Sequence, residues 1–387
     1  MQKKILIIGL SKDLELINFF KKITNRIIVL DNFKKKNIIF KNLKNLEECF
    51  KAVKNLKITH SISDQSDIAI KAYGFISNRL NLYSIPYKKI KIFTNKFLCR
   101  SRLFLNKNLK KNIPRFYKLN HLKDIDNIKY NKNGFIVKPI ESQGSRNTFK
   151  FRNNKQIKNF FLSNNYKEFI IEDYVNGKDI SVEGFVEDKN FFLLSISKKK
   201  KFKNSFVDRE LIYTNFEKKN KLKLKNICDQ IIKTINLSKG LFHAEFKLLK
   251  NNKIFLIEAT CRGPGSGVAS KILNLIKRFS YKEYLKSLCF NYQFKHNINF
   301  NLPIYNHVIL GWYQFKNKKV KKINIEGVRK KNYLVDIEIK KNYQNKNLSI
   351  VNNSSDRYLR YIVKGNNYLD LIKKKRQLLK LIKVQYY

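Results

Sequence analysis

Two short segments in the middle of the chain each place one carboxylate inside an apolar strand pattern. The first spans 243–249 and carries Glu245, and the second spans 254–260 and carries Glu258. If the two Asn residues at 251–252 form a two-residue turn, counting outward puts the carboxylates opposite each other. Opposed residues share a sheet face with Cβ atoms about 5 Å apart, so two like charges there need a cation between them. The spacing favours a site for Mg²⁺ and a nucleotide, because Mg²⁺ prefers oxygen ligands such as carboxylates and phosphates.

An alternative interpretation is that both carboxylates lie on the solvent face of an ordinary hairpin. Lys247 or Lys253 would then relieve their repulsion. The following residues favour a site instead. Arg262 lies four residues beyond Glu258, and the glycine-rich segment 263–267 leads into a candidate helix start, where free N–H groups could hold an anion.

These segments resemble the ATP-grasp superfamily of carboxylate ligases. That family has an H-x-E-F strand followed by I-E-x-N-x-R, and the matching residues here are 243–246 and 257–262. The resemblance implies that Glu245 and Glu258 bind Mg²⁺, with Mn²⁺ as an alternative. Thr260 stands where the family places an Asn ligand. Because a hydroxyl is a poorer ligand than an amide carbonyl, the resemblance leaves open whether one metal ion or two bind.

An upstream segment resembles the family's D-K-x-x-x-R motif, which is followed by I-P. Residues 93–100 match it, with Asn95 in place of Asp, and 113–114 supply the Ile-Pro pair. The resemblance implies that Lys96 contacts a phosphate of ATP.

A second upstream segment, 135–147, resembles the V-K-P-x-x-S-x-G-S-x-G strand and flexible loop of the family. It implies that Lys138 reaches a nucleotide phosphate while backbone N–H groups of the loop cover the phosphates. Asn147 replaces the last glycine, a mild departure because Asn tolerates the left-handed conformation. The loop residues implied to bind the nucleotide are Ser142, Gly144 and Ser145.

A third upstream segment, 169–183, resembles I-E-E-Y-V-x-G-x-E-x-S-V-E. It implies that Glu172 and the backbone near Val175 read the adenine edge. Asp179, in place of a longer Glu, would take the ribose hydroxyls. Each motif alone also fits an ordinary strand end, but four in the family's order across roughly two hundred residues favour the family.

The elements around these motifs predict an α/β and α+β multidomain fold. Strand and helix patterns alternate over 5–31 and continue through 61–80, which is typical of a small doubly wound sheet. The tail contains strand patterns near 308–313, 348–351 and 362–365, and a helix pattern over 368–382. The predicted units are a pre-ATP-grasp α/β domain over 1–92, an ATP-grasp domain over 93–300 with a mobile lid near 134–187, and a β-rich C-terminal domain over 301–387. The last resembles the biotin-carboxylase and carbamoyl-phosphate-synthetase branch.

The chain is strongly basic, with 82 Lys and Arg against 29 Asp and Glu, a net charge of +53. Such a field is typical of nucleic-acid binding. However, the lysines are scattered and accompany abundant Asn, Ile, Phe and Tyr, a pattern that A/T-rich codons explain. We expect the runs 34–36, 198–201 and 373–375 to be solvated faces or loops, and we expect no nucleic-acid partner.

The five cysteines form no CxxC pair or zinc spacing, which fits a reducing cytoplasm. Cys261 is expected to be a buried filler and not a nucleophile. The apolar run within 3–10 is short, which favours a buried parallel strand over a signal peptide, and no segment approaches the roughly 20 apolar residues of a membrane span. These features predict a cytoplasmic enzyme. The family resemblance implies that this enzyme forms a homodimer.

The resemblance implies ligation through an acylphosphate. The γ-phosphate of ATP passes to a small-molecule carboxylate, and an amine then displaces phosphate, releasing ADP. The implied catalytic residues are Lys138 and Arg262, which with Lys96 spread the developing charge. Arg262 and 263–267 would hold the acylphosphate or substrate carboxylate, and Arg209 is a weaker candidate for the second substrate. Two alternatives are a bicarbonate-activating, carboxylase-like enzyme and a noncatalytic basic protein that binds nucleic acid.

Overall fold

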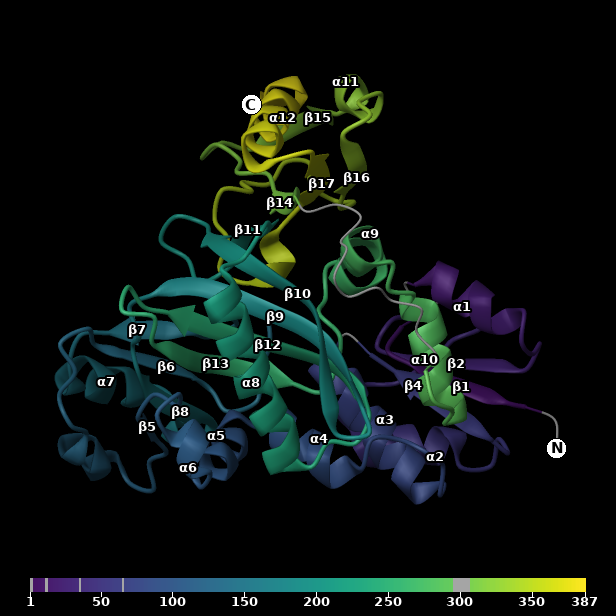
Figure 1. The fold of residues 1–387 in the computed structure, drawn as a ribbon, viewed down its shortest axis with the longest axis horizontal. Helices are drawn as coiled ribbons and strands as arrows, with labels where there is room; N and C mark the ends of the chain where they lie inside the picture. Colours follow the sequence, from purple (N-terminus) through teal and green to yellow (C-terminus); the bar gives the residue numbers. More distant parts are fainter. Residues whose placement is uncertain (1–2, 11–12, 35, 65, 295–306) are drawn as a thin grey trace.

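A long antiparallel sheet runs through the middle of the molecule, with a small parallel sheet to one side and the C-terminal elements beyond its far end (Figure 1). The computed structural model describes residues 3–10, 13–34, 36–64, 66–294 and 307–387. The mixture of parallel and antiparallel sheets with helices confirms the predicted fold class.

The N-terminal unit is a parallel sheet of order β3-β2-β1-β4, as the alternating pattern predicts. Ile5 and Ile7 of its first strand join one core cluster, whereas Leu6 and Ile8 join another, so both faces of this strand are covered. The strands are β1 (Ile5–Ile8), β2 (Ile27–Asp31), β3 (Ile39–Phe40) and β4 (His60–Ser63), and the helices are α1 (Leu14–Lys21), α2 (Leu46–Val53) and α3 (Asp67–Arg79).

The central sheet is antiparallel, with the order β13-β12-β9-β10-β11-β14-β17-β16. Its strands are β9 (Lys178–Glu187), β10 (Asn190–Lys201), β11 (Asp208–Tyr213), β12 (Gly240–Leu248), β13 (Ile254–Thr260), β14 (His307–Trp312), β16 (Leu334–Ile339) and β17 (Leu359–Gly365). Because β11 pairs with β14, the sheet continues from the predicted ATP-grasp domain into the predicted C-terminal domain.

A second antiparallel sheet, of order β5-β8-β6-β7, lies beside the free edge of β13 (Figure 1). Its strands are β5 (Phe116–Tyr117), β6 (Phe135–Pro139), β7 (Phe149–Phe151) and β8 (Phe169–Asp173), covered by α7 (Asn154–Phe161) and two 3-10 turns. The predicted lid limits, 134–187, match neither end of this small sheet and stay a prediction. The small sheet already begins at β5, and β9 belongs to the central sheet, because pairing between strands and not motif spacing decides the boundary.

The C-terminal part combines three strands of the central sheet with a two-stranded sheet, β15 (Val320–Asn324) and β18 (Lys383–Tyr386). The predicted final helix is present as α12 (Tyr368–Leu381), whereas the predicted strand at 348–351 is irregular. The remaining helices are α4 (Tyr87–Thr94), α5 (Lys96–Phe104), α6 (Lys107–Lys110), α8 (Lys218–Ile235), α9 (Leu273–Lys277), α10 (Tyr281–Phe290) and α11 (Glu326–Arg329).

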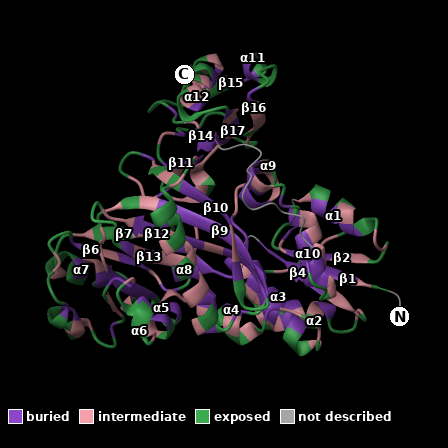
Figure 2. Ribbon diagram, in the orientation of Figure 1, coloured by how far each residue is buried: buried purple, intermediate pink, exposed green. Residues whose placement is uncertain are grey.

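The hydrophobic cores cross the predicted domain limits. One cluster joins Ile8 to Val182 and Ile232, and a second joins Ile7 to Tyr284 and Leu310. Figure 2 shows buried residues running along the strands of the central sheet and into the N-terminal unit. The limit at 92/93 falls inside α4, and the limit at 300/301 lies outside the described residues, so the domain limits stay predictions.

Candidate active site

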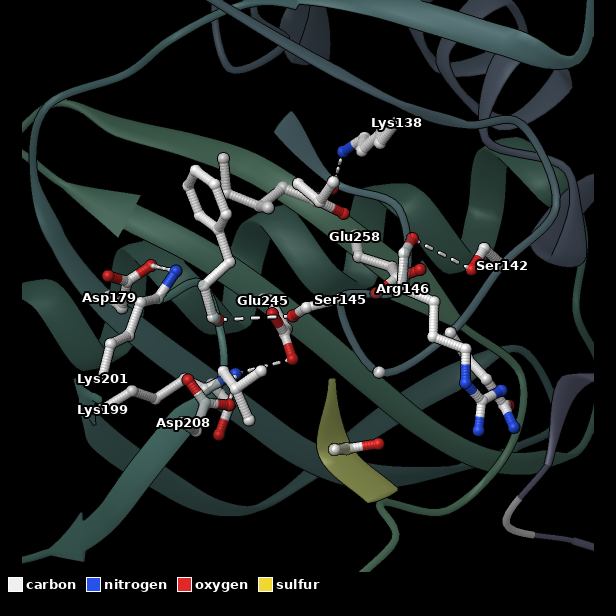
Figure 3. Close-up of a pocket in the computed structure, with 18 of the residues that line it drawn as sticks. Lys138, Ser142, Ser145, Arg146, Asp179, Lys199, Lys201, Asp208, Glu245 and Glu258 are labelled. Atoms are coloured by element: carbon white, nitrogen blue, oxygen red, sulfur yellow. Dashed lines mark hydrogen bonds and ion pairs between the residues drawn. The ribbon is translucent and has the colours of Figure 1, made fainter. Parts of the chain in front are cut away.

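The predicted site residues converge on one cavity of about 520 Å³ between the central sheet, the small sheet and loops that include residues of the C-terminal part. Of the predicted residues, Figure 3 labels those around the cavity as follows: Lys138, Ser142, Ser145, Asp179, Glu245 and Glu258. All the predicted residues except Thr260 line this cavity: Lys96, Lys138, Ser142, Gly144, Ser145, Glu172, Val175, Asp179, Glu245, Glu258 and Arg262.

The register of β12 and β13 places Glu245 opposite Glu258, as predicted. The predicted two-residue turn is nevertheless wrong. Leu249 donates its N–H to the carbonyl of Lys253 at 2.9 Å, which leaves three residues in the turn, and only Asn252 among them has a positive φ, 59°. The pairing shifts by one residue between Leu256 and Glu258, so a β-bulge compensates for the longer turn and restores the carboxylate pair.

Glu245 is held by a cation that the sequence reasoning missed. Lys199 of β10 bridges Glu245 and Asp208, with both N···O distances 2.6 Å (Figure 3). Burial alone would raise the pKa of Glu245, but the Lys199 ammonium and His243 hold it well below its ordinary value. Burial would likewise lower the pKa of His243, yet Glu183 and Glu245 raise it to about 9. The site is therefore a linked set of opposite charges.

The prediction that 198–201 is a solvated run is wrong for every second residue. In β10 the side chains alternate between faces, so Lys199 and Lys201 line the cavity while Lys198 and Lys200 are exposed. The period of two within an apolar strand pattern was the signal that could have found them.

Glu258 lies on the same face and faces Lys96, the first residue of α5, at 3.3 Å. Two opposed carboxylates suit Mg²⁺, which commonly uses one or two carboxylates together with substrate phosphates. No group of three His, Cys, Asp or Glu side chains with metal-binding spacing occurs in the described residues. The carboxylate pair fits a metal that takes its remaining ligands from a nucleotide and water.

Thr260 is not brought to the cavity with the other predicted ligands. Its side chain is 2% exposed, and its hydroxyl lies 3.5 Å from the carbonyl of His243, to which it donates. Cys261, next to it, is 1% exposed, and burial raises the pKa of its thiol, in agreement with a packing role.

Lys138 and Glu172 form a buried ion pair of 2.7 Å between β6 and β8. Arg100 of α5 also donates to Glu172, at 2.9 Å, and to the carbonyl of Ile257. Burial alone would raise the pKa of Glu172, but the charges of Arg100 and Lys138 lower it. For Lys138, burial is the larger effect and lowers the pKa of its ammonium, although the Glu172 carboxylate opposes it. Arg100 matched the upstream motif, but no sequence feature indicated that it would anchor Glu172.

The glycine-rich loop between β6 and β7 folds over the cavity. Gly144, Ser145 and Asn147 have φ of 69°, 61° and 51°, so Asn147 does adopt the left-handed conformation expected of it. Lys96 donates to the carbonyl of Ser142 at 2.5 Å. Gly144 accepts from the N–H of Ser354 at 3.1 Å, which ties the loop to the C-terminal part.

At the other end of the cavity, Asp179 is already paired with two lysines. Lys247 lies 2.8 Å from its carboxylate. Lys201 lies 3.4 Å away (Figure 3). Ribose binding by Asp179 stays a prediction, and these lysines add two cations that the motif comparison did not indicate.

Arg262 connects the cavity to the N-terminal unit. Its Nε lies 2.5 Å from the carboxylate of Asp67, the first residue of α3. Burial alone would lower the pKa of the Arg262 guanidinium, but the Asp67 carboxylate outweighs this effect and raises it. Asp64 accepts from the N–H of Gly263 and so holds the glycine-rich segment that follows. Arg209, by contrast, does not line the cavity and lies 3.6 Å from Glu210.

The profile of the ATP-grasp domain family matches residues 132–270, which contain the small sheet, the carboxylate pair and Arg262. Residues 132–270 form an ATP-grasp domain. A curated D-alanine--D-alanine ligase of Pelagibacter ubique (strain HTCC1062) is 26% identical over 224 residues, which cover 53% of this chain and 70% of that protein.

Solved structures extend this ATP-grasp likeness over the whole chain. The L-amino acid ligase of Bacillus licheniformis has a TM-score of 0.82 at 15% identity, covering 100% of this chain and 99% of that one. The biotin carboxylase domain of Hydrogenobacter thermophilus 2-oxoglutarate carboxylase, solved with MgADP, ADP and bicarbonate, has a TM-score of 0.72 at 12% identity, covering 100% and 91%. At these identities the structural likeness shows the fold alone.

Together, the family match and the related ligases confirm three predictions: the ATP-grasp fold, the use of ATP and an ATP-dependent ligase activity. Within the described residues, no helix is both long and apolar enough to cross a membrane.

Proposed function

We propose that this ATP-grasp enzyme joins a small carboxylic acid, such as an amino acid, to an amine through an acylphosphate. The observation that carries the proposal is the opposed pair Glu245 and Glu258 in a cavity that also contains Lys96, Lys138 and Arg262. The names of the D-alanine--D-alanine ligase and the L-amino acid ligase support an amino acid as substrate.

In the first step, a substrate carboxylate oxygen attacks the γ-phosphorus of ATP, the bond to the bridging oxygen breaks, and ADP leaves. In the second, the amine nitrogen attacks the acylphosphate carbon, the C–O bond to phosphate breaks, and the amine loses a proton. Lys96, Lys138 and Arg262 would stabilise the charge on the transferring group without any protein nucleophile.

Glu245 and Glu258 would hold Mg²⁺, which would neutralise phosphate charge when bound. Lys199 and Lys96 now contact these carboxylates, so both lysines would move or bind phosphate oxygens instead. The loop at 142–145 would cover the phosphates with its backbone N–H groups, Glu172 and Val175 would face the adenine, and Asp179 the ribose.

A bicarbonate-activating enzyme is the second candidate. It is favoured by the likeness of the whole chain, including the C-terminal part, to a biotin carboxylase domain solved with bicarbonate.

The five free cysteines, all buried, support a reducing cytoplasm. A homodimer completes the proposal.

The decisive experiment measures ADP release from Mg-ATP with a matrix of carboxylates and amines, including bicarbonate, and identifies products by mass spectrometry. We expect release that requires an acid and an amine together, with a product one water lighter than their sum. Release driven by bicarbonate alone would favour the second candidate. Failure of Mg-ATP to bind would overturn the proposal.

A further inference from the structure

Arg357 lines the cavity from the C-terminal part, outside every motif that the sequence comparison used. It directly follows the 3-10 turn Ser354–Asp356. Its guanidinium carbon lies 3.7 Å from the ring centroid of Trp312, the last residue of β14. A guanidinium that lies over an aromatic ring can still donate hydrogen bonds from the N–H groups in its plane.

The hydrogen bonds of Arg357 all go to neutral oxygens. Its Nε donates to the carbonyl of Ser354 at 3.1 Å, its Nη1 to the carbonyl of Asp208 at 3.4 Å, and its Nη2 to the hydroxyl of Ser266 at 3.0 Å. An arginine has five N–H donors, so two are left over. Within the described part of the chain, no carboxylate oxygen lies within 4.0 Å of this guanidinium.

Arg360, three residues later, shows the opposite arrangement. It contacts Asp336 and Glu338, both at 2.7 Å. The carboxylate of Asp208 is in turn 2.6 Å from Lys199. Burial, together with repulsion from Arg360, lowers the pKa of Arg357 to about 10 in spite of Asp208. A partly buried cation without its own counter-ion is the kind of group that an anionic ligand stabilises.

The wall beside Arg357 is open to a ligand. Gly265 lies between Arg262 and Ser266, and a Cβ placed there would meet no atom within 4 Å. Ser266 and Arg262 line the same cavity. A substrate could therefore lie against the backbone at Gly265 with Arg262 on one side and Arg357 on the other.

We propose that Arg357, Trp312 and Ser266 form a subsite that binds an anionic group, a carboxylate or a phosphate, of one of the two substrates. This inference rests on the proposed ligase function and adds that one substrate carries an acidic group that does not react. Arg357 would bind this group through its free N–H donors and would select acidic substrates over neutral ones.

Trp312 gives a direct readout, because it is the single tryptophan of the chain. The experiment titrates the full-length protein, with Mg-ADP present, with acetate, L-alanine, L-alaninamide and inorganic phosphate at constant ionic strength, and follows tryptophan fluorescence. We expect a saturable change with a carboxylate or with phosphate, and none with L-alaninamide. Which anion responds separates the two sources of the acidic group.

Three variants complete the test. Arg357→Gln should weaken the response about 10- to 100-fold, as expected for lost hydrogen bonds to a charged group, and Arg357→Lys should keep part of it. Arg102→Gln, which changes an exposed arginine of α5 outside the cavity, should respond like the unchanged protein. Thermal unfolding of each variant checks that it is folded.

An undiminished response in folded Arg357→Gln would overturn the subsite, as would the absence of any saturable response to all three anions. A rise in melting temperature with Mg-ATP is measured on the same samples. If Mg-ATP binds but no anion responds, the subsite fails and the proposed function stands. If Mg-ATP does not bind, the proposed function itself fails.

Discussion

The cavity has two sides of different origin. The strand side consists of Lys138, Glu172, Lys199, Glu245 and Glu258, which lie on β6, β8, β10, β12 and β13. The loop side consists of Arg262, Ser266 and Arg357, which lie between regular elements.

On the strand side each charge has an opposite partner, whereas on the loop side Arg357 has no carboxylate within 4.0 Å among the described residues. The difference teaches that charges on paired strands are neutralised within the sheet, while an arginine on a loop from a distant part of the chain is left for a ligand under the proposed function.

The largest expected effect comes from the strand side. Glu258→Gln removes one of the two charges that would hold Mg²⁺, and we expect the rate of ATP turnover to fall by about 10³-fold or more, since electrostatic stabilisation dominates phosphoryl transfer. Steady-state ADP release measures this, and circular dichroism checks the fold. Glu283→Gln, a half-exposed carboxylate on α10, is the matched control. Unchanged turnover in the Glu258 variant would remove the metal assignment.

Glu172→Gln tests whether the buried pairs of the strand side also stabilise the fold. The change leaves Arg100 and Lys138 without their carboxylate, and we expect a loss of about 3–5 kcal/mol in the free energy of unfolding. Urea denaturation at pH 7 measures it.

The same carboxylate sets a pH dependence. Its pKa is lowered from 4.5 in the folded chain, so its contribution is present above that value and is lost as the pH falls through the folded pKa. The stability gap between the unchanged protein and Glu172→Gln should therefore narrow in acid. A gap that stays constant from pH 7 down to the acid transition would show that the ion pair is not its source.

Asp67→Asn tests how the loop side is positioned. Asp67 holds Arg262 from the N-terminal unit, and without its charge we expect a fall in kcat of about 10- to 100-fold, because small misplacements of a charge-stabilising group are costly. The KM for ATP should change little, since Asp67 does not line the cavity. Asp126→Asn, which removes an exposed carboxylate, is the control. A normal kcat in the Asp67 variant would show that Arg262 keeps its position without the carboxylate of Asp67.

The smallest effect is expected for Thr260→Val. The hydroxyl makes one long hydrogen bond to a carbonyl and is outside the cavity, so we expect a loss of about 1 kcal/mol or less in stability and an unchanged kcat. A large fall in kcat, with Mg²⁺ dependence shifted to higher concentration, would instead support Thr260 as a ligand.

Local sequence pattern predicted the carboxylate pair of the strand side, whereas Lys138 and Glu172 were implied by the family resemblance. Glu245 and Glu258 were found because strand residues alternate with a period of two and the hairpin is short. Even there, the register came out as predicted only because a bulge near Ile257 offset a turn one residue longer than expected. Lys199 was missed because a lysine run looks solvated until its strand is paired on both sides.

By itself, the sequence determined the strand periods, the order of the motifs and therefore the family, the ATP-dependent chemistry and nearly all the residues of the strand side. Only the tertiary structure decided that Thr260 is buried and does not line the cavity, that Asp67 meets Arg262 across 195 positions of the chain, and that the Arg357 guanidinium lies over the ring of Trp312. The physical reason is that periodic side chains are positioned by their neighbours in sequence, whereas ion pairs between loops depend on how separate sheets and helices pack.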